Sequence, residues 1–242
     1  MIPKVIHYCW FSGEEKTELV KKCMDTWRKK MPDYEIKEWN CDNFDFSINS
    51  FAREAIECKK WAFASDFVRL YVLYNEGGIY LDSDIEVLKN FDDLLDCDGF
   101  TGLESKGVIT AWLFGSKKGN PLIKEFLDYY EDKHFINKNK MMTIPNTVPL
   151  SEICKKYGLK NDDVLYKLEN MTIYPTDFFC GKSIVDGKIR LTNNTYTIHH
   201  FEGGWQSRKE RFIRTLKYKM FCLFGNRMYP FVRSFYIKYF KK

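Results

Sequence analysis

One segment constrains this chain more than any other: a helix-like stretch, two glycines and a short apolar strand that ends in two aspartates. Residues 61–74 read WAFASDFVRLYVLY, and residues 77–84 read GGIYLDSD. Side chains two positions apart in a strand project to the same side, so Asp82 and Asp84 point together. Hard divalent cations prefer such oxygen ligands and keep positions open for phosphates. The segment predicts a metal-bound diphosphate at a strand's end; a solvated acidic turn is the alternative interpretation.

The stretch before the glycines has the spacing of a helix with one apolar face. That face consists of Phe63, Phe67, Leu70, Tyr71 and Tyr74. Asp66 and Arg69 are the only charged residues in the stretch, and their spacing of three makes them neighbours on a helix. Buried charges need partners. Two interpretations follow: a mutual ion pair, or a pair that faces a polar ligand beside the aspartate-bearing strand.

These residues resemble a known family. The matching positions are Ala64, Ser65, Asp66, Arg69, Leu73 and residues 77–84. Together they resemble the DXD-containing sugar-binding region of family 32 glycosyltransferases. That family includes bacterial capsular polysaccharide transferases, the yeast Golgi initiating mannosyltransferase and, more distantly, the catalytic domains of the large clostridial glucosylating toxins. Residues 2–10 are similar to its opening strand, and residues 199–205 are similar to its closing motif. The resemblance implies an α/β fold of the GT-A type, with a single Rossmann-like mixed sheet.

The resemblance also implies a donor site for a nucleotide sugar. Trp10 would stack on the nucleotide base, and Asp66 would accept hydrogen bonds from ribose or sugar hydroxyls. Arg69 would contact the donor sugar or its phosphate, and Tyr80 would lie near the diphosphate. Considered without the family, Trp10 ends a strand-like run, where α/β sheets bind ligands, although a core tryptophan would also fit.

A metal site for Mn²⁺ or Mg²⁺ is implied in the same way. Asp84 would bind the ion directly, Asp82 would help through water or the ribose, and His200 would complete the ligand shell. Trp205 would cap the diphosphate. This chain has two glycines before Trp205, where family members usually place a serine. His199 and His200 are adjacent, so in an extended chain only one of them can reach a given metal.

Composition and spacing predict one α/β catalytic domain over residues 1–205, with an extension over 206–242. At 242 residues and 45% hydrophobic content, the chain can bury a sizeable core. The expected strands are 2–10, 34–39 and 107–115, and the expected helices are 15–31, 50–59 and 121–132. Residues 133–150 are polar and irregular, which marks a candidate acceptor loop or lid. Eight widely spaced cysteines without a C-x-x-C pair favour reduced thiols.

The extension is a separate electrostatic unit. Residues 205–242 contain eleven Lys and Arg residues against the single Glu210, and they are rich in aromatic side chains. Two basic amphipathic helices are expected, at about 206–223 and 228–240, and they suit an anionic membrane surface. Packing of these helices on the acidic body is the alternative. Nucleic-acid binding is disfavoured because no recognition motif accompanies the charge. Without a secretory signal or a long apolar span, we expect a cytoplasmic protein at the inner face of the cell membrane.

The function predicted is metal-dependent transfer of a sugar from a nucleotide diphosphate sugar, by preference a UDP-sugar, to a glycan or lipid-linked oligosaccharide hydroxyl. Asp82, Asp84 and Arg69 would be the catalytic residues, and the pathway would be capsule or O-antigen synthesis. The family implies retention of the anomeric configuration. Two alternatives stay open: a metal-dependent nucleotidyl- or phosphotransferase, and a non-catalytic membrane adaptor. A glycosidase is disfavoured, because two carboxylates on one strand face cannot flank a sugar ring.

Overall fold

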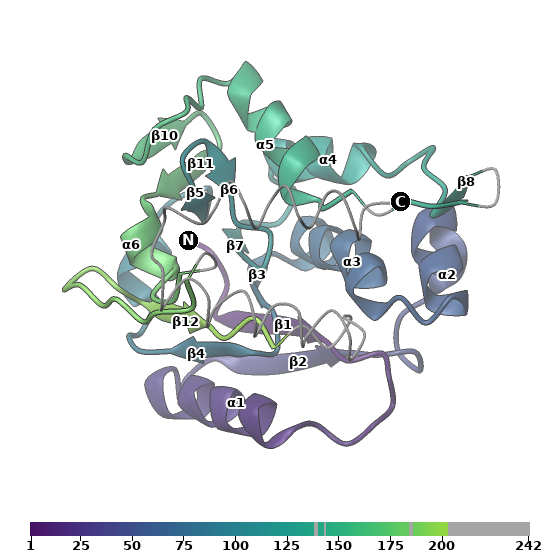
Figure 1. Cartoon of the computed structure of the whole chain (residues 1–242), viewed down its shortest axis with the longest axis horizontal. Helices are drawn as coiled ribbons and strands as arrows, with labels where there is room; N and C mark the ends of the chain where they lie inside the picture. The colour runs from purple at the N-terminus through teal and green to yellow at the C-terminus, as the bar shows by residue number, and fades with distance from the viewer. Residues whose placement is uncertain (138–139, 143, 184–185, 203–242) are drawn as a thin grey trace.

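A mixed eight-stranded sheet forms the centre of the computed structural model (Figure 1), which describes residues 1–137, 140–142, 144–183 and 186–202. Its strands run in the order β10-β11-β5-β7-β3-β1-β2, and β6 pairs with β5. These strands are β1 (Val5–Cys9), β2 (Glu35–Trp39), β3 (Gly78–Leu81), β5 (Gly99–Ser105), β6 (Val108–Ile109), β7 (Leu113–Ser116), β10 (Tyr166–Leu168) and β11 (Met171–Tyr174). Two small sheets pair β4 (Ile85–Val87) with β12 (Thr197–His199) and β8 (Ile136–Asn137) with β9 (Lys140–Met141).

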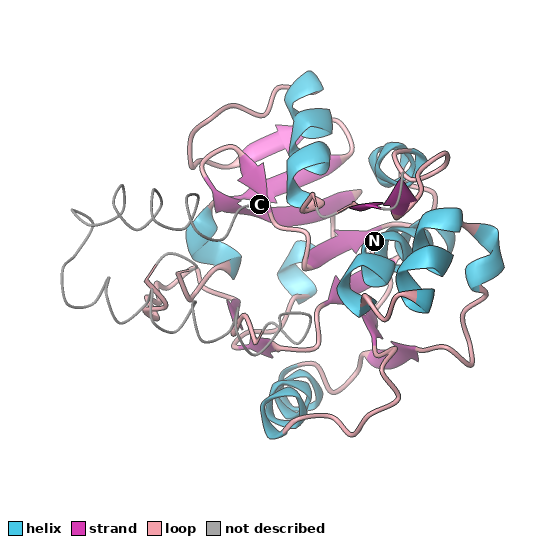
Figure 2. Cartoon of the chain, turned by 45° about the vertical axis from the view of Figure 1, so that its right-hand side comes forward, coloured by secondary structure: helices cyan, strands magenta, loops and turns pink. Residues whose placement is uncertain are grey.

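Helices lie on both sides of the sheet (Figure 2). They are α1 (Glu18–Lys30), α2 (Ser50–Glu57), α3 (Trp61–Glu76), α4 (Pro121–Asp128), α5 (Thr147–Lys156) and α6 (Thr176–Phe179), with short 3₁₀ turns at Phe46–Ile48 and Asp92–Leu94. One hydrophobic core lies under α2, α3, α4 and α5, and a second lies between the sheet, α1, α6 and β4. Trp27 of α1 is fully buried in the second core, where its indole N–H donates to the Ile85 carbonyl oxygen at 2.7 Å.

Strand directions bring several strand ends to one edge of the sheet. β1 pairs in parallel with β2 and β3, and β7 lies antiparallel between β3 and β5. The carboxyl ends of β1, β3 and β5 therefore share an edge, which is where open α/β sheets bind ligands. The architecture confirms the predicted α/β class and the single mixed sheet expected of the GT-A type.

The joint between α3 and β3 depends on two glycines, as predicted. Gly77 has a φ of +74°, and its N–H closes the helix on the Leu73 carbonyl oxygen at 2.9 Å. Gly78 has a φ of +103°, and a Cβ there would lie 2.7 Å from the Val5 carbonyl oxygen. Neither position accepts a side chain without strain, so the chain passes directly from α3 into the buried strand β3.

The structure differs from the sequence predictions in two segments. The strand expected over 107–115 is divided into β6 and β7, because the chain leaves the β5–β6 pairing and then crosses to pair with both β3 and β5. The segment 133–150, expected to be irregular, contains the β8–β9 hairpin and the start of α5. Trp205 and the helices expected over 206–242 lie outside the described residues.

Candidate active site

Two short strands build the site at the carboxyl end of β3. The backbone N–H of Asp82 donates to the Trp112 carbonyl oxygen at 3.0 Å, which continues the β3–β7 pairing by one residue. The chain then turns into β4. β12 pairs antiparallel with β4 and sets His199 opposite Ile85, and the His200 N–H donates to the Asp84 carbonyl oxygen at 3.1 Å. A histidine more than a hundred residues downstream is thereby placed beside the aspartates.

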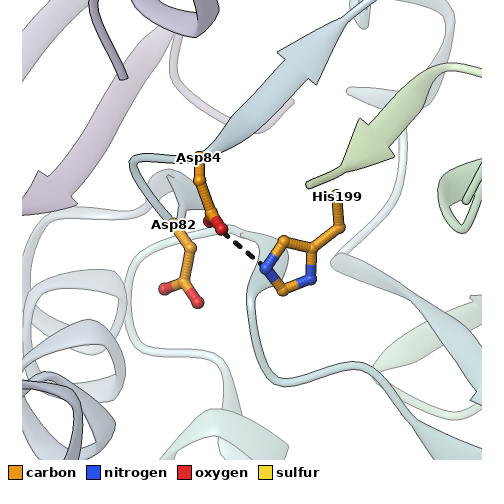
Figure 3. A group of neighbouring side chains, drawn as sticks. All are labelled: Asp82, Asp84 and His199. Carbon is orange, nitrogen blue, oxygen red and sulfur yellow. Dashed lines mark ion pairs between the residues drawn. The ribbon is translucent and has the colours of Figure 1, made fainter. Parts of the chain in front are cut away.

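Asp82, Asp84 and His199 form a potential metal centre. Each offers one ligand atom, and these atoms lie within 4.8 Å of one another. The three side chains converge from the β3–β4 turn and from β12 (Figure 3), and His199 Nε2 lies 3.2 Å from an Asp84 carboxylate oxygen. Two carboxylates and an imidazole are suitable ligands for a divalent transition metal such as Mn²⁺. The donor set therefore fits the divalent ion that the family resemblance implies.

The two aspartates differ in their electrostatic surroundings. Burial disfavours the charged form of Asp84. The neighbouring His199 outweighs this effect, together with the backbone N–H of Glu202, which donates to the Asp84 carboxylate at 2.8 Å. The pKa of Asp84 is thereby lowered to about 2. Burial raises the pKa of Asp82, with Arg69 opposing the shift and the like charge of Asp84 adding to it. Asp84 is thus an anion at neutral pH, and the repulsion between the two carboxylates favours a cation between them.

The structure brings His199, and not the predicted His200, to the aspartates. The His200 ring lies 2.8 Å from a Glu86 carboxylate oxygen instead. Successive residues of a strand face opposite sides, and the pairing of β12 with β4 decides which side faces Asp84. His199 Nδ1 and the neighbouring Trp112 Nε1 are buried and have no hydrogen-bond partner within the described part of the chain.

Arg69 joins the candidate metal centre to Asp66, which is predicted to bind the donor. It is 4% exposed, and its guanidinium lies 3.2 Å from Asp66 and 3.4 Å from Asp82. Hydrogen bonds to Ser65, and one to the Ala111 carbonyl oxygen, hold it in place. Burial alone would lower the pKa of Arg69, but the nearby carboxylates, Asp82 above all, raise it. The ion pair weighed from the sequence is therefore present, and the ligand-facing position stays a prediction.

The other predicted donor residues also lie at this edge. The Tyr80 hydroxyl donates to an Asp82 carboxylate oxygen at 3.0 Å, and the Tyr80 ring lies 4.9 Å from the Arg69 guanidinium. Trp10 follows β1, the strand beside β3, and its indole N–H donates to the Glu14 carbonyl oxygen at 2.8 Å. The Lys16 ammonium lies 5.3 Å from the Trp10 ring centroid. Trp10 is therefore one strand away from the aspartates.

Asn146 belongs to the site although sequence reasoning missed it. Its side-chain amide donates to the Asp66 carboxylate at 2.8 Å, across eighty positions of sequence. No local spacing points to this contact. The nearest sequence signal is the place of Asn146 in the segment 133–150, the candidate acceptor loop or lid.

Replacing His199 and His200 one at a time should distinguish the metal ligand from its neighbour. His199→Ala should weaken Mn²⁺ binding by at least about tenfold, because it removes a donor that converges with both aspartates. Loss of a residue that only hydrogen-bonds to a metal ligand typically costs about tenfold or more in metal affinity. His200→Ala should change Mn²⁺ affinity far less, because its ring pairs with Glu86. Electron paramagnetic resonance titration of free Mn²⁺ measures both. A larger loss in His200→Ala would contradict this assignment.

Asp66 should make stability depend on pH in an unusual direction. Burial raises its pKa to about 7, with Arg69 opposing the shift, from an ordinary value of 3.8. The folded protein then holds more protons than the unfolded chain between about pH 4 and 7, so the free energy of unfolding should fall as pH rises through this range. Asp66→Asn lacks this titrating group. Its free energy of unfolding, measured by urea denaturation with chelator present, should therefore fall less steeply with rising pH than that of the wild type. Equal slopes would show that Asp66 ionises normally.

Comparisons with known proteins agree with the site. Residues 17–101 match a glycosyltransferase sugar-binding region containing the DXD motif. The chain is 32% identical over 158 residues to an uncharacterized glycosyltransferase of Acanthamoeba polyphaga mimivirus, covering 61% of each protein. It is 30% identical over 129 residues to inositol phosphoceramide mannosyltransferase 3 of Schizosaccharomyces pombe, covering 50% of this chain and 35% of that protein. The chain thus spans less than two thirds of the length of these relatives.

Two solved structures are similar to parts of this chain. The PaToxG glycosyltransferase is 26% identical, with a TM-score of 0.44 over 52% of this chain and 59% of that one. A glycosyltransferase involved in glycosylation of the major capsid of PBCV-1 is 15% identical, with a TM-score of 0.47 over 86% and 96% of the two chains. The match of residues 17–101 and these two sequence relatives show that this part of the chain resembles the sugar-binding region of glycosyltransferases that carry a DXD motif.

Proposed function

We propose that this chain is a metal-dependent glycosyltransferase that moves a sugar from a nucleotide diphosphate sugar to an acceptor hydroxyl. The observation that carries the proposal is the convergence of Asp82, Asp84 and His199 within 4.8 Å at the end of β3. Arg69 and Asp66 lie directly beside this group. A metal centre next to a buried cation and a hydroxyl-binding carboxylate is the arrangement that a sugar diphosphate requires.

The chain's own residues have distinct parts in the proposed reaction. Asp82, Asp84 and His199 would hold the ion, which when bound supplies Lewis-acid stabilisation of the departing diphosphate. The fixed positive charge of Arg69 adds electrostatic stabilisation from a buried, preorganised position. The Tyr80 hydroxyl keeps Asp82 oriented. Trp10 would stack on the base and Asp66 would bind sugar hydroxyls. Retention of configuration is proposed from the family resemblance.

The acceptor is proposed to be a glycan attached to a lipid. One curated relative is named an inositol phosphoceramide mannosyltransferase. In this chain, four apolar side chains before α5 and in its first turn are 41% to 54% exposed: Ile136, Met141, Ile144 and Val148. Exposed apolar side chains of this kind suit an acceptor with a lipid part. A role in capsule or O-antigen synthesis, and a cytoplasmic location at the inner membrane face, belong to the same proposal.

Membrane attachment is assigned in this proposal to the basic aromatic segment 205–242. No helix among the described residues is long and apolar enough to cross a bilayer. A protein that ends at residue 204 should lose co-sedimentation with vesicles containing anionic lipid, because each basic residue near such a surface contributes about 1 kcal/mol. Neutral vesicles are the control. Absence of vesicle binding by the intact chain, with full activity of the shortened protein on soluble acceptors, would contradict the attachment.

The alternatives explain fewer residues. A nucleotidyl- or phosphotransferase would use a similar aspartate pair but usually has a glycine-rich phosphate loop, which this sequence lacks. An adaptor without catalysis would leave the convergent ligand set without a role. Release of nucleoside diphosphate upon turnover indicates sugar transfer, whereas release of pyrophosphate indicates nucleotidyl transfer.

Calorimetric titration of nucleotides tests the proposal. UDP, GDP, UDP-glucose and GDP-mannose are titrated with and without Mn²⁺ into the wild type, Asp84→Ala and the surface control Asp25→Ala. We expect one base to bind only with Mn²⁺, and binding to fall by at least about a hundredfold in Asp84→Ala, because the ionised ligand is lost. Asp25→Ala should match the wild type. No nucleotide binding by the wild type at any Mn²⁺ concentration would overturn the transferase assignment.

A further inference from the structure

A buried asparagine ties the segment before α5 to the donor half of the site. Asn146 is 7% exposed, and Asp66 on α3 is 8% exposed. The Asn146 amide donates to Asp66 Oδ1 at 2.8 Å. Two buried polar side chains from distant segments, at ordinary hydrogen-bond distance, form a specific contact, because an unpaired group in either place would carry a desolvation cost.

Asn146 holds a helix-capping position without serving as a cap. It precedes α5, yet its side chain makes no capping hydrogen bond. Asn49 and Asn120 hold the same position at α2 and α4, and their side chains accept from the N–H groups of Ala52 and Leu122 at 3.0 and 2.9 Å. That bond is the usual reason for asparagine at this position. The Asn146 side chain is instead directed to Asp66.

The two oxygens of Asp66 have different tasks. Oδ1 accepts from Asn146 and lies 3.2 Å from Arg69. No hydrogen bond from any described residue reaches Oδ2, and the side chain is 12% exposed. One hydrogen-bond donor and one ion-pair partner thus restrain Oδ1 and leave Oδ2 available to a ligand. A rigid acceptor of this kind discriminates between hydroxyl arrangements, since a misplaced hydroxyl leaves it unpaired.

We propose that Asn146 is a positioning residue that orients Asp66 toward the hydroxyls of the donor sugar. The inference rests on the proposed function. It assigns sugar recognition to the Asn146–Asp66 pair and leaves the diphosphate to Asp82, Asp84 and His199. The inference also gives the segment 133–146 a part in donor selection in addition to acceptor binding. The reason is that Asn146, the last residue of this segment, orients Asp66.

Calorimetry with paired ligands tests the assignment. The nucleoside diphosphate and its nucleotide sugar, UDP with UDP-glucose and GDP with GDP-mannose, are titrated into the wild type, Asn146→Ala and Asn146→Leu with Mn²⁺ present. Both variants should retain diphosphate affinity within about twofold and lose about tenfold or more of the sugar-specific affinity, because the donor to Asp66 is gone. Asn146→Leu fills the space of the side chain without offering a donor and separates this effect from packing.

Asn49→Ala is the matched control, since Asn49 is a similarly buried asparagine at a helix start whose hydrogen bonds join it to Ala52 and Tyr130 and not to Asp66. It should lower the melting temperature and leave the ratio of sugar to diphosphate affinity unchanged. An unchanged ratio in Asn146→Ala, or an equal loss of both ligands in Asn146→Ala and Asn146→Leu, would overturn the assignment.

A second readout keeps the inference apart from the proposed function. If the wild type binds no nucleotide, the proposed function fails, and carboxyl carbon NMR still reports on Asp66. Asn146→Ala should raise the pKa of Asp66 further, because a hydrogen bond to the ionised form is lost while the other titratable neighbours, Arg69, Asp82 and Tyr130, stay in place. An unchanged Asp66 titration would overturn the positioning role.

Discussion

The buried guanidinium of Arg69 is the interaction on which the rest of the site depends. It reaches from α3 to the end of β3, where it lies within 3.4 Å of both Asp66 and Asp82. Burial of this cation is tolerable only because two carboxylates and several carbonyl and hydroxyl oxygens surround it, and removal of one partner from such a pair typically costs about 3–5 kcal/mol. Because Asp82 belongs to the candidate metal centre and Asp66 to the proposed sugar site, one cation fixes the two relative to each other.

The remaining ligands come from segments that the sheet brings together. β12 reaches the site only through its pairing with β4, and this pairing decides that His199 faces Asp84 while His200 faces Glu86. Asn146 comes from the segment that leads into α5. The site is therefore a rigid centre, built on the α3–β3 joint, to which two later segments contribute one polar residue each. Such an arrangement combines a preorganised charge pattern with segments whose sequence can alter selectivity.

The α3–β3 joint could be predicted from the sequence because its signals are local. Helical spacing, the residues Gly77 and Gly78 and the short interval between Asp82 and Asp84 each act within a few residues, although the two aspartates meet in the turn between β3 and β4 and not by strand alternation. The choice between His199 and His200 could not, because it depends on the register of a strand pairing across more than a hundred positions. The contact of Asn146 with Asp66 is equally nonlocal. Strand 107–115 was predicted as one element because its apolar character does not reveal that the chain changes partners at residues 110–112.

The central claim is that Asp82, Asp84 and His199 jointly hold the ion that receives the donor diphosphate. Crystals grown with Mn²⁺ and the nucleoside diphosphate that binds best, with diffraction recorded at the manganese absorption edge, test it most directly. The account predicts one strong anomalous peak in contact with all three side chains, and diphosphate oxygens in the remaining coordination positions. A manganese peak at other residues, or a diphosphate bound away from this group, would contradict it.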